Sequence, residues 1–269
     1  MTSELERKAD ALHAVLDDIG RVAIATSGGV DSMTLAVVAG RRLGANAAMI
    51  HAVSPAVPPE ATARVRAYAE REGWFLDIID AGEFEDEDYL RNPSNRCFFC
   101  KTNLYGTIAE RTVATICSGT NTDDLGDFRP GLKAAEDHAV RHPYVEAGID
   151  KDTVRALAER LDLFDLAELP AAPCLSSRLE TGLRVSPERL GLVHAVERLI
   201  SRELEPKTVR CRLFHDGVAI QLDPASLERV SGGLHAAVTE LLHSHGERRA
   251  PRFEPYRMGS AFHKTTAHG

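Results

Sequence analysis

The sequence predicts an α/β protein, with a doubly wound parallel sheet in a large N-terminal domain and a smaller C-terminal α+β domain. Two observations predict this. Over roughly the first half of the chain, short apolar runs alternate with amphipathic segments of helical length, which is typical of parallel strands joined by helices. The last third instead contains one long helical pattern followed by two adjacent alternating strands. A length of 269 residues suits one large domain and one small one.

The elements of the large domain follow a βαβαβ order. An amphipathic helix opens the chain and ends at Gly20, and a strand follows at Val22–Ala25. The expected later elements are a helix to Leu43, a strand at Ala47–Val53, a helix at Glu60–Glu72, a strand at Trp74–Ile79, a helix at Cys97–Arg111, a strand at Val113–Cys117, a helix at Leu132–His138, an extended piece at Pro143–Glu146 and a helix at Lys151–Leu161.

The small domain is expected to begin near Ser186, in the loop that contains LPAAPCLSSRLETG. Its predicted elements are a helix at Pro187–Leu204, strands at Val209–Phe214 and Val218–Leu222, two short helical stretches, and an extended piece at Arg252–Glu254. We therefore expect domains at 1–185 and 186–260. Residues 261–269 are expected to form a disordered tail, because terminal segments rich in small and polar residues are seldom tied down.

Composition and charge narrow the class of protein. The chain is 43% hydrophobic and 27% charged, and it has no apolar run near the roughly 18 residues of a membrane span. Its N-terminal segment does not resemble a secretion signal. A net charge of -8 disfavours general binding to nucleic acid, which depends on neutralising phosphates. Five cysteines without an export signal indicate reduced thiols. These features predict a cytoplasmic protein that is not bound to a membrane.

A glycine-rich turn follows the first strand and precedes a helix. Backbone N–H groups at such a helix N-terminus bind anions, and two glycines allow a phosphate to approach closely. The turn matches neither the ordinary P-loop nor the dinucleotide fingerprint. It resembles the PP-loop of the N-type ATP pyrophosphatases, although a plain capped β-to-α turn is the alternative. The predicted nucleotide-binding residues are Ser27, Gly28, Gly29, Val30, Asp31 and Ser32.

An acidic residue inside this turn needs its own explanation. A carboxylate beside a phosphate is repelled unless a cation lies between them, so Asp31 is predicted to hold Mg²⁺. The stretch SGTNTDDLGD follows the fourth strand, where ligands of such sheets bind. From it we expect Gly119, Thr120 and Asp124 to contact the nucleotide, while the aspartates of this stretch could instead cap helices.

The cysteines have an informative spacing. Cys97 and Cys100 form a C-x-x-C at a helix start, where the dipole favours thiolates, and Cys174 lies far along the chain. Three thiolates could hold a [4Fe-4S] cluster with one open iron. In the alternative, Cys97 and Cys100 are idle thiols and Cys174 acts alone. Cys117 and Cys211 are expected to pack inside the protein.

Taken in order, the segments SGGVDS, NPSNRCFFCKTNLY, SGTNTDDLGDFRPGLKAAED, PAAPCLSSR, VRCRLFHDG and FEPYRMGS resemble the LarE family of ATP-dependent sulfur transferases over nearly the whole chain. The resemblance implies a PP-loop ATPase domain and a role in making the nickel-pincer nucleotide. It implies that a carboxylate of pyridinium-3,5-biscarboxylic acid mononucleotide is adenylated, that pyrophosphate leaves, and that sulfur then displaces AMP. It further implies a homo-oligomer that works with other enzymes of that pathway.

The resemblance gives the cysteines a role. Cys174 matches the family cysteine that gives up its own sulfur in single-cysteine members, in a single turnover. For members with three cysteines at positions like Cys97, Cys100 and Cys174, the resemblance implies a [4Fe-4S] cluster that passes on sulfide from its open iron. Because this chain has all three, we expect the cluster route. The segment CLSSRLETG departs from the family pattern after Arg178.

Three arginines complete the predicted site. Arg210 and Arg212 are two residues apart on a predicted strand, so both project from one face. The resemblance assigns them to the phosphate of the pyridinium nucleotide, and a solvated sheet face is the alternative. Arg178 is predicted to neutralise a substrate anion near Cys174, with a structural ion pair as the alternative.

Two other functions compete with this prediction. A PP-loop tRNA thiolase would also use ATP, Mg²⁺ and a cluster, but the acidic net charge and the lack of a basic stripe disfavour it. A regulatory module that binds ATP without chemistry would belong to another class, and it would release no pyrophosphate.

Overall fold

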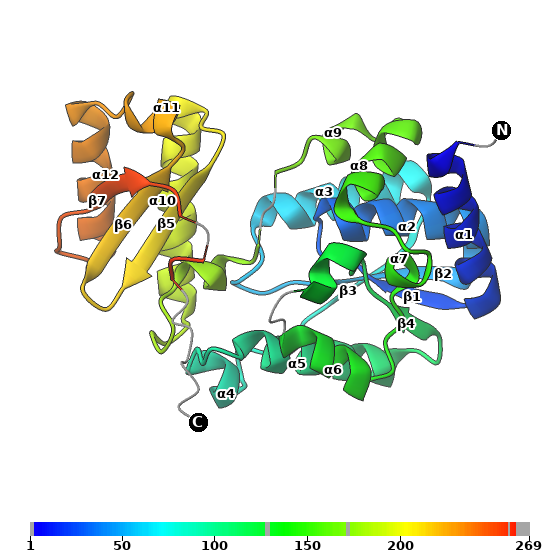
Figure 1. The fold of residues 1–269 in the computed structure, drawn as a ribbon. Coiled ribbons are helices and arrows are strands. Elements are labelled where there is room, and N and C mark those ends of the chain that lie inside the picture. Colours follow the sequence, from blue (N-terminus) through cyan, green and yellow to red (C-terminus); the bar gives the residue numbers. More distant parts are fainter. Residues whose placement is uncertain (1–2, 127–129, 171–172, 258, 262–269) are drawn as a thin grey trace. The chain divides into compact units, whose positions relative to one another are not determined.

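The computed structural model describes residues 3–126, 130–170, 173–257 and 259–261, and within them the chain divides into two compact units. Unit 1 comprises Met1–Glu83 and Cys97–Ala172, and unit 2 comprises Phe84–Arg96 and Pro173–Gly269. Figure 1 shows helices and a sheet in each unit. Residues 262–269, most of the expected tail, lie outside the described residues.

Unit 1 is built on a four-stranded parallel sheet. Its strands are β1 (Val22–Ala25), β2 (Ala47–Ala52), β3 (Phe75–Ile79) and β4 (Thr115–Cys117). Their order across the sheet is β3-β2-β1-β4, with Val22 of β1 level with Ala47 and Thr115 on either side. From β1 the chain therefore continues through β2 to β3 at one edge of the sheet, and β4 then pairs with the other side of β1. This reversal makes the crevice between β1 and β4 the expected ligand position.

Helices cover both faces of this sheet (Figure 1). They are α1 (Glu4–Ile19), α2 (Val30–Leu43), α3 (Pro59–Glu72), α5 (Arg96–Arg111), α6 (Pro130–Asp137), α7 (Pro143–Glu146), α8 (Lys151–Arg160) and α9 (Phe164–Ala167), with short 3₁₀ turns at Gly44–Asn46 and Thr122–Gly126. Because successive strand residues point to opposite faces, Ile24 packs with α1, α2, α3, α8 and α9 while Ala23 packs with α5 and α6.

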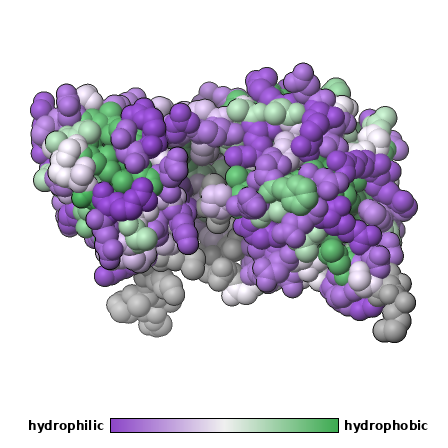
Figure 2. Space-filling model, turned by 90° about the horizontal axis from the view of Figure 1, so that it is seen from above, coloured by the Kyte–Doolittle hydropathy of each residue, from purple (hydrophilic) through white to green (hydrophobic). Residues whose placement is uncertain are grey.

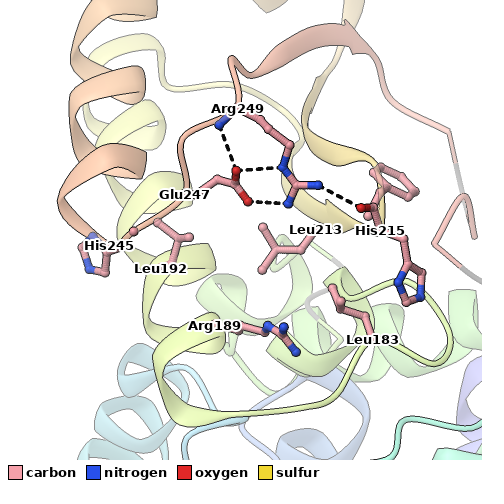
Figure 3. Close-up of a pocket in the computed structure, with 10 residues that line it drawn as sticks. Leu183, Arg189, Leu192, Leu213, His215, His245, Glu247 and Arg249 are labelled. Atoms are coloured by element: carbon pink, nitrogen blue, oxygen red, sulfur yellow. Dashed lines mark hydrogen bonds and ion pairs between the residues drawn. The ribbon is translucent and has the colours of Figure 1, made fainter.

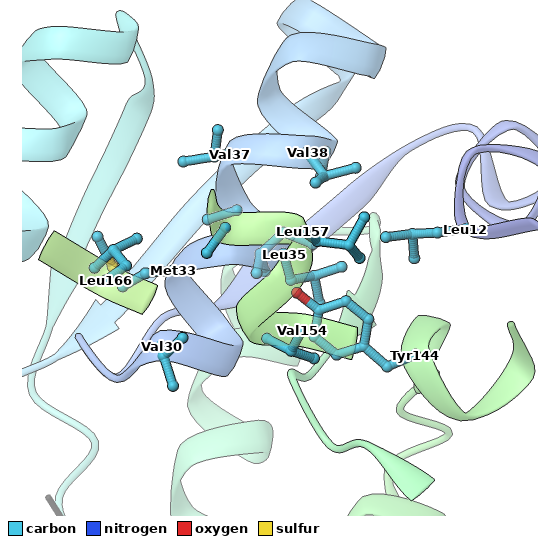
Figure 4. Close-up of a cluster of buried hydrophobic side chains, with 14 of the residues drawn as sticks. Leu12, Val30, Met33, Leu35, Val37, Val38, Tyr144, Val154, Leu157 and Leu166 are labelled. Carbon is cyan, nitrogen blue, oxygen red and sulfur yellow. The ribbon is translucent and has the colours of Figure 1, made fainter. Parts of the chain in front are cut away.

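The first of these two cores surrounds α2. Val30 to Ala39 of this helix are buried except at Asp31, and Figure 4 shows Leu35 beside Leu157 of α8 and Tyr144 of α7. A helix that is apolar nearly all round must be enclosed by other elements. The glycine turn therefore leads into the most enclosed helix of unit 1, which fixes its position.

Unit 2 contains a second, smaller sheet. Strands β5 (Val209–Phe214) and β6 (Gly217–Leu222) are antiparallel, and β7 (Arg252–Pro255) pairs with β6 in parallel. The helices of this unit are α4 (Glu87–Leu90), α10 (Pro187–Leu204), α11 (Pro224–Leu227) and α12 (Gly232–Ser244), with a 3₁₀ turn at Leu175–Arg178. Along β5, Cys211 is fully buried and Arg210 and Arg212 share the opposite face, as the alternation predicted.

The division into units differs from the expected boundary near Ser186. Within residues 173–185, Leu179 forms a bridge to Leu213 of β5, and the Glu180 N–H donates to the Leu213 carbonyl at 2.9 Å. The segment 84–96 joins them, because the buried Asn92 side chain donates to the carbonyls of Glu180 and Leu183. Long-range backbone pairing, which a loop-like composition does not reveal, thus places both segments in unit 2.

The predicted α/β class and the parallel sheet are confirmed. The expectation of an extended piece at Pro143–Glu146 is wrong, because these residues form α7. Pro143 begins that helix, a position where proline's missing N–H costs nothing. Extended pairing occurs just before it, at the bridge between Arg141 and Cys117.

The surface seen in Figure 2 is mostly hydrophilic. Across the described ranges, the helices all lack the combination of length and apolar character that a membrane span requires.

A buried histidine ties the end of β1 to its neighbours. His51 of β2 is fully buried, with Nδ1 2.8 Å from the Thr26 carbonyl and Nε2 2.9 Å from the Thr62 hydroxyl. Burial lowers the pKa of His51, so the folded chain keeps the ring neutral. As the pH falls below about 6.5, the unfolded chain takes up a proton first. The neutral ring therefore stabilises the fold above that pH, and this contribution is lost on acidification.

We expect His51→Asn to flatten the fall in unfolding free energy between pH 7 and pH 5, because the variant lacks the buried titrating ring. At pH 8 the unfolding free energy of this variant should be lower by about 1–2 kcal/mol, because the hydrogen bond to the Thr62 hydroxyl is lost. Urea unfolding followed by the fluorescence of Trp74, the single tryptophan of the sequence, measures both. The exposed His243→Asn variant is the control, and an unchanged pH slope in His51→Asn would contradict this account.

Candidate functional site

The glycine turn after β1 is held closed by its two serines. The Ser27 N–H donates to the Ser32 hydroxyl at 3.0 Å, the two hydroxyl oxygens are 3.0 Å apart, and Ser32 donates to the Gly29 carbonyl at 3.2 Å. Ser32 is almost fully buried. Its hydroxyl therefore shapes the turn, whereas the exposed Ser27 lies at the mouth.

The two glycines have different reasons to be glycine. Gly28 has φ +82°, and a Cβ there would lie 2.8 Å from the Ala61 carbonyl oxygen, so the protein itself excludes a side chain. At Gly29 a Cβ would have the Ser27 hydroxyl, 3.5 Å away, as its nearest described neighbour. The space beside Gly29 is thus open at the N-cap of α2. A helix N-terminus opening on such a space suits a phosphate.

The loop after β4 meets this turn. A Cβ on Gly119 would lie 2.7 Å from the Ser32 nitrogen and 2.8 Å from the Asp31 carbonyl carbon, so the two loops touch backbone to backbone. Ser118 links this loop to its surroundings, with its hydroxyl 3.0 Å from that of Thr120 and 2.8 Å from Nδ1 of His142. Burial lowers the pKa of His142, which favours a neutral ring in this contact. The predicted residues of both loops therefore share one edge of the sheet.

Asp31 lies in the first turn of α2 with its carboxylate already engaged. Its Oδ1 accepts from Asn121 Nδ2 at 3.1 Å, and its Oδ2 pairs with the Lys151 ammonium. The Tyr144 hydroxyl donates to the Asp31 carbonyl oxygen at 3.1 Å, and burial holds the pKa of Tyr144 well above its usual value. Sequence reasoning found Asp31 but missed Asn121, Tyr144 and Lys151.

Asp123 and Asp124 of this loop both accept hydrogen bonds from backbone N–H groups. Asp124 accepts from the Asn121 N–H at 3.1 Å, and Asp123 accepts from the Lys151 N–H at 3.1 Å. Asp124 therefore shapes the loop that presents the Asn121 amide.

Two of the three predicted cluster ligands lie in unit 1. Cys97 is exposed and Cys100 half-buried, and their spacing on α5 puts them on one helix face. Cys174 belongs to unit 2. Within either unit, the described residues include no group of three or more His, Cys, Asp or Glu side chains placed to hold a metal.

Cys174 is exposed at the start of a turn whose carbonyl groups are held by buried arginines. Arg96 donates to the Ser176 carbonyl at 3.1 Å, and Arg212 donates to the Ser177 carbonyl at 3.1 Å. The Tyr89 hydroxyl lies 2.7 Å from the Ser176 hydroxyl. The backbone beside the thiol is therefore fixed while the thiol itself faces outward.

Arg178 contributes to the same arrangement. It is 3% exposed and forms a two-pronged ion pair with Glu197 of α10, at 2.9 and 3.1 Å. It also donates to the carbonyls of Pro173 and Cys174 at 2.6 and 3.3 Å. Sequence reasoning predicted that Arg178 neutralises a substrate anion. These contacts fit the alternative of a structural ion pair, and the role of Arg178 toward a substrate anion stays a prediction.

The two arginines of β5 differ in exposure. Arg212 is 4% exposed and donates to Gln221 at 2.7 Å, whereas Arg210 is half-buried near the ring of Tyr256. Burial lowers the pKa of both guanidinium groups, and the positive charge of Arg178 lowers it further. An anion would relieve this crowding of positive charge, and Arg210 is the more accessible of the two.

Unit 2 also contains a cavity of about 340 Å³ that includes none of the predicted site residues (Figure 3). Within its wall, Glu247 and Arg249 pair with each other, and Arg249 donates to the His215 carbonyl at 2.8 Å. Pairing with Arg249 lowers the pKa of Glu247 to about 2. Glu247 and Arg249 thus neutralise each other within this wall, which also includes the Arg189 side chain.

The residues that sequence reasoning missed carry weak signals. Asn121 stands in the polar stretch after β4 and could have been included on that ground. Lys151 and Glu197 lie in ordinary helical patterns, where a charged residue usually faces solvent. Their contacts depend on helix packing and on residues distant in sequence.

Comparison with known proteins gives similarity over most of the chain. An uncharacterized protein of Synechocystis sp. is 37% identical over 229 residues, covering 84% of this chain and 85% of its own. The pyridinium-3,5-bisthiocarboxylic acid mononucleotide synthase of Lactiplantibacillus plantarum is 30% identical over 228 residues, covering 83% and 82%. An uncharacterized protein of Methanocaldococcus jannaschii is 23% identical over 207 residues, covering 76% and 78%. No family model matches the chain.

We expect Gly119→Ala to destabilise unit 1 by about 1–3 kcal/mol, because the new methyl group would overlap backbone atoms that cannot move independently. Urea unfolding with Trp74 fluorescence measures this. Gly191→Ala in α10 is the matched control, since a Cβ there meets no described atom within 4 Å and alanine favours helix. Wild-type stability in Gly119→Ala would show that the loops are not packed this closely.

Proposed function

The chain belongs to the LarE family, that of the pyridinium-3,5-bisthiocarboxylic acid mononucleotide synthase of Lactiplantibacillus plantarum, and from this premise we propose that it is an ATP-dependent sulfur transferase. Its substrate would be pyridinium-3,5-biscarboxylic acid mononucleotide, and its product a thiocarboxylate. The observation that carries the proposal within the molecule is the exposed Cys174 thiol on a turn pinned by buried arginines. A reactive thiol needs both access and a fixed direction of attack.

The first half of the reaction belongs to unit 1. A substrate carboxylate attacks the α-phosphorus of ATP, pyrophosphate leaves, and a mixed anhydride with AMP forms. This step converts a poor electrophile into one that sulfur can attack. The open space beside Gly29 at the start of α2 supports a PP-loop role for this turn, because helix N–H groups can receive the phosphates without a side chain between them.

The residues around Asp31 are suited to Mg²⁺. This ion takes oxygen ligands, keeps several waters, and is usually held by one or two carboxylates together with the substrate's phosphates. Asp31 supplies carboxylate oxygens beside the phosphate turn, and the Asn121 amide orients one of them by donating to Oδ1. When bound, the ion would neutralise the phosphate charge, and Asp31 would anchor it.

The second half of the reaction requires sulfur, and Cys174 is central to both possible routes. Cys97, Cys100 and Cys174 would hold a [4Fe-4S] cluster, and their thiol chemistry suits one. When bound, such a cluster would supply sulfide at an iron that lacks a protein ligand. In the other route, the Cys174 sulfur attacks the anhydride, AMP leaves, and the Cβ–S bond then breaks to leave dehydroalanine in the chain. We prefer the cluster route because all three cysteines are present.

The arginines of unit 2 would receive the phosphate of the pyridinium nucleotide. Arg210 is accessible and lies two residues from the buried Arg212 on the same face of β5. Arg212 already donates hydrogen bonds to the Gln221 side chain and to the Ser177 carbonyl. We therefore assign direct phosphate contact to Arg210, with Arg212 supplying charge and holding the Cys174 turn.

We expect the purified protein to release pyrophosphate from ATP when the biscarboxylate nucleotide is present. Asp31→Asn should lower this rate by about 100-fold or more, because the metal anchor loses its charge. Asp152→Asn, an exposed neighbour on α8, is the matched control. A protein that binds ATP but releases no pyrophosphate would be a regulatory module, and normal turnover in Asp31→Asn would remove the metal assignment.

The sulfur route is tested by iron and acid-labile sulfide content on protein purified without oxygen. We expect about four irons per chain in the wild type and their loss in Cys100→Ser. Cys117→Ala should keep its iron, because burial raises the pKa of Cys117 to about 12 and so disfavours the thiolate that binds metal. Iron-free protein that thiolates its substrate once and converts Cys174 to dehydroalanine would establish the sacrificial route instead.

A further inference from the structure

Lys151 occupies a position that disfavours it energetically. It is the first residue of α8, where the positive end of the helix dipole repels a cation. Asp150 caps the helix by accepting from the Thr153 N–H at 2.8 Å, and the Lys151 N–H donates to Asp123 at 3.1 Å. The backbone of Lys151 is thus well held, and its side chain must be explained by what it contacts.

That side chain reaches Asp31. The Lys151 ammonium pairs with Asp31 Oδ2, and the two side chains remain 31% and 27% exposed. A comparable surface pair, Lys133 with Glu136, is 61% and 74% exposed. The Asp31–Lys151 pair is therefore half-buried, at the mouth of the glycine turn, yet water and small ions can still reach it.

The main chain and the side chain of Asp31 are held differently. Its carbonyl is fixed by the fully buried Tyr144, and its Oδ1 by the Asn121 amide. The partner on Oδ2 is the end of a long, flexible lysine chain. One carboxylate oxygen is thus held by a group that can leave without disturbing the fold.

We propose that Lys151 is an exchangeable placeholder for the divalent cation. Without nucleotide, its ammonium neutralises Asp31. With ATP and Mg²⁺ bound, Asp31 would hold the ion through its carboxylate, and the freed Lys151 ammonium would pair with the phosphate chain. Lys151 then stabilises the negative charge of the pyrophosphate as it leaves. The N-terminal position on α8 supports this, because a phosphate there would offset the repulsion between the lysine and the helix dipole.

This inference rests on the proposed use of ATP, and it makes one prediction that does not depend on turnover. Lys151 and a divalent cation compete for the same carboxylate, so removing the lysine should improve metal binding to the nucleotide-free protein. Removing it should weaken binding of the metal–ATP complex. Simple structural damage at this site would weaken both.

The test uses Lys151→Met, which keeps an unbranched side chain one heavy atom shorter and removes the charge. Binding of Mn²⁺ without nucleotide, followed by electron paramagnetic resonance, should become about fivefold tighter, as expected for loss of one partly exposed competing ion pair. Binding of ATP at saturating Mg²⁺, followed by calorimetry, should become about tenfold weaker, as expected for loss of a charged hydrogen bond.

Three further variants make the result decisive. Lys133→Met should leave both affinities unchanged, Lys151→Arg should keep Mn²⁺ binding weak, and Asp31→Asn should abolish Mn²⁺ binding. Lys151→Met with wild-type affinity for Mn²⁺ would overturn the placeholder role, and wild-type affinity for ATP would overturn the transfer to phosphate. If the wild type releases no pyrophosphate but the Mn²⁺ result holds, the failure lies in the proposed function and not in the competition at Asp31.

Discussion

The proposed nucleotide site of unit 1 depends on the backbone contact between Gly119 and the first turn of α2. In a parallel sheet whose strand order reverses between β1 and β4, the loops after both strands emerge at the same edge. A glycine at 119 lets the second loop approach within van der Waals distance of Asp31 and Ser32. This approach brings Asn121 to the carboxylate of Asp31. The enclosed position of α2 then keeps the whole arrangement in place.

In unit 2, hydrogen bonds from buried side chains fix the backbone beside the exposed Cys174 thiol. Arg96, Arg178 and Arg212 are nearly fully buried, and burying charged groups is costly unless their hydrogen bonds are made. Here the carbonyl groups of the turn after Cys174 accept many of those bonds, and Glu197 pairs with Arg178. In the proposed reaction, the same positive charges would also favour the approach of an anionic substrate.

The chemistry proposed for this family member is divided between the two units. Unit 1 contains the glycine turn, Asp31 and the C-x-x-C, while unit 2 contains Cys174 and the arginines of β5. Unit 2 includes Phe84–Arg96, which leads directly into α5 and hence into Cys97. Cys97 therefore follows directly in the chain on a segment of unit 2, the unit that contains Cys174.

The sequence by itself determined the fold class, the glycine turn and the polar loop after β4, and it led to the proposed role of Cys97, Cys100 and Cys174. These features depend on local patterns. Apolar periodicity predicts strands and helices, and the spacing of glycine, aspartate and cysteine residues indicates binding sites. The alternation along β5 likewise placed Cys211 inward, opposite Arg210 and Arg212. Only the tertiary structure decided that Lys151 pairs with Asp31, that Glu197 holds Arg178, and that residues 84–96 and 173–185 belong to unit 2. Each of these is a contact between residues distant in sequence, and which partner a charged side chain meets depends on how the helices pack.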